Sequence, residues 1–175
     1  MTLTHEQVES GLTDKNADVR AAWSERTDWT PTPEQVERGL TDKNSAVREA
    51  WALRKDFTPT SEQVERGLTD YDEQTRSAWA RRTDYTPTQE QVARGLNDPA
   101  EYTLLTETDG VINEVNVYLR EEWAGRKDFK PTPEQIDAGL TDNNGAVRDT
   151  WLKKARQIQS DQFVFDERYE EVFSI

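Results

Sequence analysis

The apolar residues of this chain fall into two short helical patterns that repeat together. In residues 30–57, TPTPEQVERGLTDKNSAVREAWALRKDF, Val36 and Leu40 are four residues apart, and Val47 and Trp51 repeat this spacing. Such a spacing places side chains on one face of an α-helix. Because neither helix can bury its apolar stripe alone, we expect the two helices to pack on each other and on neighbouring units.

Polar residues of the same segment mark where the two helices begin and end. Thr32 and Gln35 stand at the spacing of a capping box, with a proline in the first turn, which predicts a helix start. We expect Gly39 to end this helix in a left-handed turn. Asp42 is expected to cap the second helix, which would run to about Arg54.

The unit recurs along the chain with a step of 28 residues. GLTDKNADVRAAW (residues 11–23) returns as GLTDKNSAVREAW, GLTDYDEQTRSAW and GLTDNNGAVRDTW, and one further copy is split into GLNDP and NVYLREEW by an insertion at residues 99–116. A fixed period of roughly 20–50 residues is typical of a solenoid. We therefore expect an all-α fold: a right-handed α-solenoid of five two-helix repeats over residues 1–156, followed by a C-terminal tail at residues 157–175.

The second helix of the unit opens with related segments, DKNADVR, DKNSAVR and DNNGAVR. Over about residues 3–156, this pattern resembles the leucine-rich-repeat variant proteins and HEAT-like helical repeat proteins. The resemblance implies stacked helix pairs. Some leucine-rich-repeat variant proteins also carry a cysteine-ligated iron–sulfur segment, but this chain contains no cysteine. The resemblance therefore implies no redox role here, and we expect no cofactor.

Composition narrows the class of protein. Hydrophobic and charged residues each make up 33% of the chain, which suits a thin stack better than a large globular core. The first residues, MTLTHEQVES, do not form an apolar leader, and no run of about 18 apolar residues occurs, so we expect a cytoplasmic protein without a membrane partner. The net charge of −13 disfavours direct binding of nucleic acid and favours a basic partner protein.

Two residue types recur once in every unit, and we expect both to be structural. The arginines could form a ladder that binds phosphates, as in HEAT-like DNA glycosylases. We favour pairing with the aspartates of the same or the neighbouring unit. The tryptophans, and a second aromatic series, are expected to form the core between units. The three series are Arg20, Arg48, Arg76, Arg120 and Arg148; Trp23, Trp51, Trp79, Trp123 and Trp151; and Trp29, Phe57, Tyr85 and Phe129.

Catalytic chemistry finds no support in the sequence. His5 is the single histidine, and no Gly-rich phosphate loop, zinc motif or EF-hand pattern occurs. The glutamates in the first turns of the first helices, such as Glu34, are explained by the helix dipole. We therefore expect no enzyme, no catalytic residue and no metal site.

The two segments that depart from the repeat are both acidic, and each carries a net charge of −4. β-type patterns around Thr-Asp-Gly in residues 99–116 predict a β-hairpin; a loop expansion without function is the alternative. Residues 157–175 are expected to extend the last helix, and then to cap the last unit or to dock on a partner. Candidate partner-binding residues are Glu101, Tyr102, Glu107, Asp109, Glu114, Tyr118, Glu121, Glu122, Asp166, Glu167, Glu170 and Glu171.

Three functions are compatible with these features. The first is an acidic inhibitor that engages the basic nucleic-acid-binding surface of a partner, with carboxylates where phosphates would lie. Phage-encoded anti-restriction and anti-CRISPR proteins are similar in character, being small, acidic, cysteine-poor and without catalytic motifs. The second is a scaffold or adaptor that binds a peptide through its concave face, using varied helix positions such as Asp18, Tyr118, Glu121 and Glu122. The third is a HEAT-like nucleic-acid binder that uses the arginine ladder.

Overall fold

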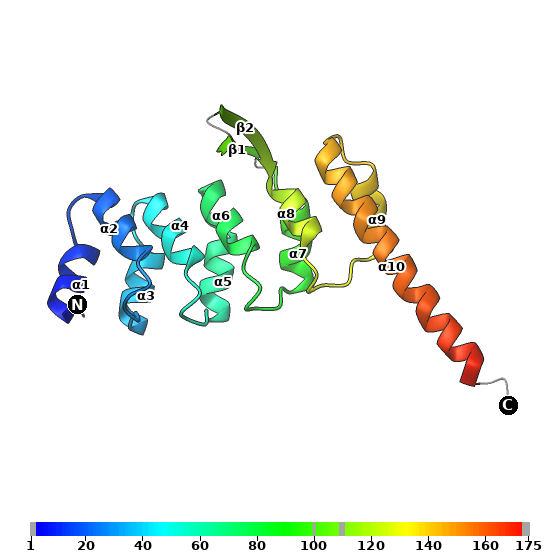
Figure 1. The fold of residues 1–175 in the computed structure, drawn as a ribbon, viewed down its shortest axis with the longest axis horizontal. Helices are drawn as coiled ribbons and strands as arrows, with labels where there is room; N and C mark the ends of the chain where they lie inside the picture. The colour runs from blue at the N-terminus through cyan, green and yellow to red at the C-terminus, as the bar shows by residue number, and fades with distance from the viewer. Residues whose placement is uncertain (1–2, 100, 109–110, 173–175) are drawn as a thin grey trace.

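The protein is a row of stacked helix pairs (Figure 1), and the prediction of a mainly helical chain is confirmed. The computed structural model describes the backbone of residues 3–99, 101–108 and 111–172, and the side chains of residues 3–99 and 119–161. The first helices of the pairs are α1 (His5–Leu12), α3 (Pro33–Leu40), α5 (Ser61–Leu68), α7 (Gln89–Leu96) and α9 (Pro133–Leu140). The second helices are α2 (Ala17–Ser24), α4 (Ser45–Leu53), α6 (Glu73–Ala80), α8 (Leu119–Gly125) and α10 (Gly145–Val172).

Every first helix begins with a capping box. At α3, the Thr32 hydroxyl accepts a hydrogen bond from the Gln35 N–H at 3.3 Å, and the Gln35 side chain accepts one from the Thr32 N–H at 2.8 Å. The same reciprocal pair is present in the other four first helices. Two backbone donors that have no partner within the helix are thereby satisfied, which fixes where each pair starts.

The predicted cap of the second helix is wrong. α4 is capped by Asn44, whose side chain accepts from the Ala46 N–H at 3.0 Å, and not by Asp42. Asp42 accepts from the Asn44 N–H at 2.9 Å and directs its carboxylate to an arginine of the preceding helix pair. The long-range ion pair thus takes the aspartate away from the local cap, and the asparagine replaces it.

The predicted role of Gly39 is also wrong. Gly39 lies inside α3, which continues to Leu40, and its φ is not in the left-handed region. The indole ring of Trp51 lies directly against it: a Cβ added to Gly39 would be 2.0 Å from Trp51 Nε1. Each first helix has the same glycine beneath the tryptophan of its partner helix. The glycine is required by this close approach of a side chain, and not by a turn.

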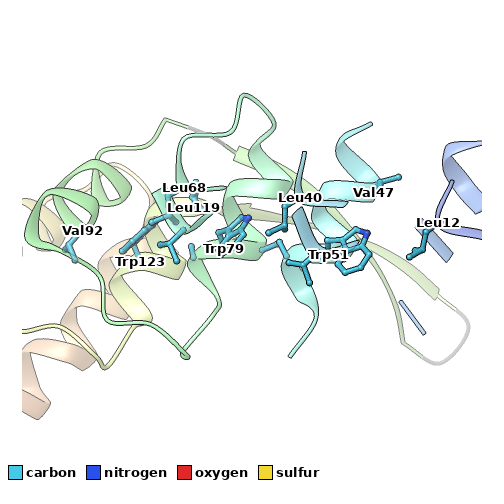
Figure 2. Packing of buried hydrophobic residues seen from close by; sticks show 14 of the residues in the cluster. Leu12, Leu40, Val47, Trp51, Leu68, Trp79, Val92, Leu119 and Trp123 are labelled. Atoms are coloured by element: carbon cyan, nitrogen blue, oxygen red, sulfur yellow. The ribbon is translucent and has the colours of Figure 1, made fainter. Parts of the chain in front are cut away.

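Consecutive second helices pack on one another from α2 to α10. The main core lies between the two rows of helices from Val8 to Trp123, and Ala124, Val147 and Trp151 form a second, smaller cluster at the last helix pair. Figure 2 shows Trp51, Trp79 and Trp123 in this core, among leucines and valines of neighbouring helices. These three tryptophans and Trp151 are at most 2% exposed. Trp23 is half-buried, since no described helix pair precedes α1.

The insertion in the fourth helix pair forms two antiparallel strands, β1 (Glu101–Thr108) and β2 (Val111–Tyr118). They project from the edge of the stack next to α6 and α8 (Figure 1). The Asp109–Gly110 turn expected between them lies outside the described residues. β2 continues past residue 116, so Tyr118 is a strand residue and not, as expected, part of a helix face.

α10 is 28 residues long and crosses the expected boundary after residue 156 without a break. It packs on α8 and α9, and its C-terminal half continues away from the stack (Figure 1). Leu140 and Leu152 remain 36% and 39% exposed on this last helix pair. Along its described backbone, α10 therefore extends the molecule and does not fold back over it.

Candidate interaction surfaces

The recurrent arginines connect each helix pair to the next. Arg20 Nε and Nη2 donate to the Asp42 carboxylate at 2.7 and 2.8 Å, and Arg20 Nη1 donates to the Asp14 carbonyl at 2.7 Å. The same link joins Arg48 to the Asp70 carboxylate. It recurs for Arg76 with Asp98 and for Arg120 with Asp142, whereas Arg148 donates to the Asp142 carbonyl.

Burial raises the pKa of the Asp42 carboxyl, but the hydrogen bonds from Arg20 and the Asn44 N–H outweigh it, so the pKa of Asp42 is lowered. Asp42 is therefore ionised at neutral pH and holds the guanidinium inside the stack. Each of the four arginines that bridge to a following aspartate donates from Nε, Nη1 and Nη2 to groups within the protein. This use of the guanidinium does not favour binding of a phosphate backbone.

A second arginine series, which sequence reasoning missed, crosses the same boundaries at the other edge of the stack. Arg82 is fully buried; its Nη1 donates to the Ala52 and Arg54 carbonyls at 2.7 Å each, and its Nη2 donates to the Phe57 carbonyl at 3.1 Å. Its guanidinium also pairs with Asp84. Arg54 and Arg126 occupy equivalent positions. The signal in the sequence was the Arg-x-Asp-aromatic ending of the first four units.

A third set of contacts joins the first helices on the surface. Glu37 on α3 accepts from Gln63 Nε2 at 3.1 Å and from Arg66 Nη2 at 2.8 Å, both on α5. Hydrogen bonds from Arg66 and Gln63 lower the pKa of Glu37. Glu9 with Gln35 and Arg38, and Glu65 with Gln91 and Arg94, form the same triad.

The junction between the fourth and fifth helix pairs lacks this third set. Ala93 stands where α1, α3 and α5 carry the glutamate, and Ala138 stands where the next helix carries the arginine. The Gln135 Nε2 is left without an acceptor among the described residues, although Gln135 keeps its capping contact with Thr132. A groove of about 520 Å³ lies at this junction. Its lining includes Ala93, Leu96, Glu134, Gln135, Ala138, Val147 and Trp151.

The second arginine series also changes at this junction, where Lys154 replaces the arginine. Lys154 Nζ donates to the Ala124 carbonyl at 3.0 Å and to the Arg126 carbonyl, and it lies 4.2 Å from the centre of the Phe129 ring. The residue two positions on is Arg156, whereas Arg54, Arg82 and Arg126 each have an aspartate there. Burial lowers the pKa of Lys154 to about 8.

This lysine predicts a pH dependence of stability. Its pKa is lower in the folded protein than in the unfolded chain, so the unfolded state binds more protons between about pH 8 and pH 10.5. The free energy of unfolding of the wild type, relative to that of Lys154→Arg, is therefore expected to rise over this window. We expect a rise on the order of 1 kcal/mol, discounted because the side chain is partly in contact with water. Urea unfolding of both proteins at several pH values measures the difference. A difference that stays flat, or falls, would contradict the prediction.

The candidate partner-binding residues lie in the two strands, on α8 and on α10, apart from Asp109. In the strand register, Glu101 pairs with Tyr118, Leu105 with Glu114, and Glu107 with Ile112. Because alternate positions of a strand share a face, this register places Glu101, Glu107 and Glu114 on one face of the two-stranded ribbon. Tyr102 belongs to the opposite face, and Asp109 lies outside the described residues.

On α10, the candidate carboxylates are spaced by four residues, Asp166 with Glu170 and Glu167 with Glu171, which places each pair on one side of the helix. On α8, Glu121 is half-buried, whereas Glu122 is used internally. Glu122 accepts from the Arg81 Nε at 2.6 Å, and its side chain is only 11% exposed. A partner-binding role for Glu122 is therefore not supported by its environment.

No protein-family model matches the chain, and comparison with curated proteins finds no similar sequence. Across the part of the chain that the structure describes, no helix is both long enough and apolar enough to cross a bilayer. The same described residues contain no cluster of three or more His, Cys, Asp or Glu side chains that could hold a metal ion.

Proposed function

We propose that this protein is a non-enzymatic protein-binding module whose acidic hairpin and acidic C-terminal helix engage the basic, nucleic-acid-binding surface of a partner. It would act as an inhibitor that presents carboxylates where the partner expects phosphates. The observation that carries the proposal is the strand register, which gathers Glu101, Glu107 and Glu114 on one face of a ribbon that projects from the stack (Figure 1). Three glutamate positions on one face of a projecting ribbon are suited to a positively charged channel.

The charge distribution of the stack supports this division of roles. Many of its carboxylates pair with arginines of a neighbouring helix pair, as in Asp42 with Arg20 and Glu65 with Arg94. The residues 99–116 and 157–175 carry −8 of the net −13, and the stack carries the smaller remainder. We infer that the stack is a right-handed α-solenoid of five repeats of the HEAT-like type, serving as the rigid support for the two acidic segments.

A capture experiment with charge variants tests the proposal. Replacing Asp166 by Asn and the three glutamates at positions 167, 170 and 171 by Gln removes four carboxylates without shortening the chain. We expect this variant, and a second with Gln at positions 101, 107 and 114, to capture nucleic-acid-binding proteins from bacterial lysate about tenfold less than the wild type. Added double-stranded DNA, or a higher salt concentration, should release what the wild type captures.

The stack offers a matched control with the same change of charge. Glu6, Glu34, Glu62 and Glu90 are exposed on the first helices, and none is in an ion pair in the described residues. Replacing these four by Gln should leave capture close to that of the wild type. Equal losses in the control and in the α10 variant would mean that net charge alone is measured, and would overturn the assignment to the acidic segments.

An adaptor function is the second candidate, and the groove at the junction of the fourth and fifth helix pairs favours it. Figure 1 shows that this junction lies between the two projecting segments, with the strands on α8 on one side and the long α10 on the other. Capture that is insensitive to DNA and salt, and that survives both charge variants, would favour the adaptor over the phosphate mimic.

A further inference from the structure

We propose that the groove between the fourth and fifth helix pairs is the docking site for a segment of the partner that carries an apolar side chain next to an arginine or lysine. This inference rests on the proposed function, because it names the part of the basic partner that the stack itself would hold. The acidic segments would attract the partner, and the groove would fix which segment is bound.

The floor of the groove is apolar and already formed. Leu96 of α7 and Val147 and Trp151 of α10 line it, and Ala93 and Ala138 stand on its two walls. Leu96 is only half-buried, whereas the equivalent Leu40 and Leu68 of the preceding first helices are each 6% exposed. Its volume of about 520 Å³ is within the range of small-molecule pockets. Val147 and Trp151 are only 1% and 2% exposed, so the apolar surface open to an incoming side chain is that of Leu96, Ala93 and Ala138.

The other junctions show what is missing here. Between α3 and α5, the partly exposed side chains of Glu37 and Arg66 pair over the same edge, and Gln63 donates to that glutamate. At the groove, both long side chains are replaced together by alanine, and Gln135 Nε2 keeps no acceptor among the described residues. An amide donor at the rim of an apolar groove suits a backbone carbonyl of an incoming chain. The occupant is thus expected to be a peptide segment.

The charge of the lining selects a cationic neighbour. Arg120 and Asp142 pair with each other at 3.0 Å across the groove, so their charges cancel. Glu134, in the first turn of α9, is exposed and makes no ion pair in the described part of the chain. The lining therefore has one carboxylate in excess and no cation in excess. An arginine or lysine of the partner, next to the apolar side chain in the groove, would neutralise Glu134, whereas an aspartate or glutamate of the partner would be repelled by it.

The chain itself suggests the variant that closes the groove. Ala93→Glu together with Ala138→Arg restores, with Gln135, the triad seen at the other three junctions, and leaves the net charge unchanged. Long-range attraction of a basic peptide is therefore kept, while the apolar site is filled. Circular dichroism and thermal unfolding should show a fold at least as stable as that of the wild type, since the variant repeats contacts that the stack already uses.

The probes are two fluorescein-labelled octapeptides, one with alternating leucine and arginine and one with serine in place of each leucine. The wild type is expected to bind the leucine peptide about tenfold more tightly, the factor that corresponds to burial of roughly one leucine side chain. In the double variant, both peptides should bind as the serine peptide does. Fluorescence anisotropy at low salt measures all four affinities.

A dye attached at the groove locates the bound peptide without relying on the double variant. Because the chain has no cysteine, Ala138→Cys carries an environment-sensitive dye at the groove, and Ala46→Cys places the same dye on an exposed position of α4 as a control. The leucine peptide should shift the emission of the dye at position 138 to shorter wavelength, and should leave the dye at position 46 unchanged.

The outcomes separate this inference from the proposed function. If the wild type binds both peptides equally and salt weakens both, the groove proposal is overturned and the acidic attraction stands. A leucine preference that the double variant retains, or an equal dye shift at both positions, places the apolar contact elsewhere and also overturns it. If neither peptide binds at low salt, both proposals fail.

Discussion

Replacing Gly67 by alanine is expected to destabilise the fold by about 3 kcal/mol, even though alanine ordinarily stabilises a helix. A Cβ at this position would lie 2.1 Å from Trp79 Nε1, far inside the closest approach of two atoms. Trp79 is 1% exposed and fixed between neighbouring helices, so its ring cannot move without opening the core. Overpacking at a site that cannot relax is among the costlier single substitutions.

Gly125 is the matched control for this substitution. It is also a helical glycine, at the end of α8, but nothing lies within 4 Å of the Cβ it would gain. Gly125→Ala should therefore leave the free energy of unfolding unchanged or raise it by roughly 0.5–1 kcal/mol. Denaturant unfolding followed by tryptophan fluorescence measures both variants. A loss below about 1 kcal/mol for Gly67→Ala would show that the glycine–tryptophan contact is not as tight as described.

The same contact shows how far the sequence could predict the fold. The 28-residue step between equivalent positions predicted stacked helix pairs, and one tryptophan in every unit predicted a tryptophan core. It did not distinguish a glycine that ends a helix from one beneath a ring, since Gly39 near the end of α3 suits both roles. The cap of α4 failed for a related reason. Asp42 and Asn44 are both good capping residues, and only the pairing of Asp42 with Arg20 from the preceding helix pair decides between them.

The groove could not be predicted from the sequence, for a different reason. In the regular repeat, residues 29 positions apart meet across a junction, as Glu37 and Arg66 do. Ala93 and Ala138 are the equivalent pair, but the insertion between them hides this equivalence until the contacts of the other junctions are known. The second arginine series recurs as visibly as the first, but its partners are mostly backbone carbonyls, which leave no trace in the sequence. A period in the sequence therefore predicts which positions are equivalent, and only the structure shows what each of them touches.

Replacing Arg82 by alanine is expected to destabilise the protein by about 3–5 kcal/mol. Arg82 connects the third helix pair to the second through hydrogen bonds to three backbone carbonyls, and its side chain is completely buried. Its removal leaves the Ala52, Arg54 and Phe57 carbonyls without their donor and Asp84 without its partner, and it opens a cavity beside the Phe57 ring. Unsatisfied buried acceptors and a cavity both lower the free energy of unfolding.

The chain contains its own controls for this prediction. Arg26 is the equivalent residue of the first helix pair, but its side chain is 42% exposed, and among the described residues it donates only to Asp28 and stacks on Trp23. Arg26→Ala should therefore destabilise the protein far less than Arg82→Ala. Arg82→Lys should fall between the two, because Lys154 shows that an ammonium can reach two of the carbonyls but not the third. Thermal and denaturant unfolding of the three variants give the order. Equal effects of Arg26→Ala and Arg82→Ala would mean that the loss comes from the surface pair with aspartate, and that the carbonyl contacts do not hold the helix pairs together.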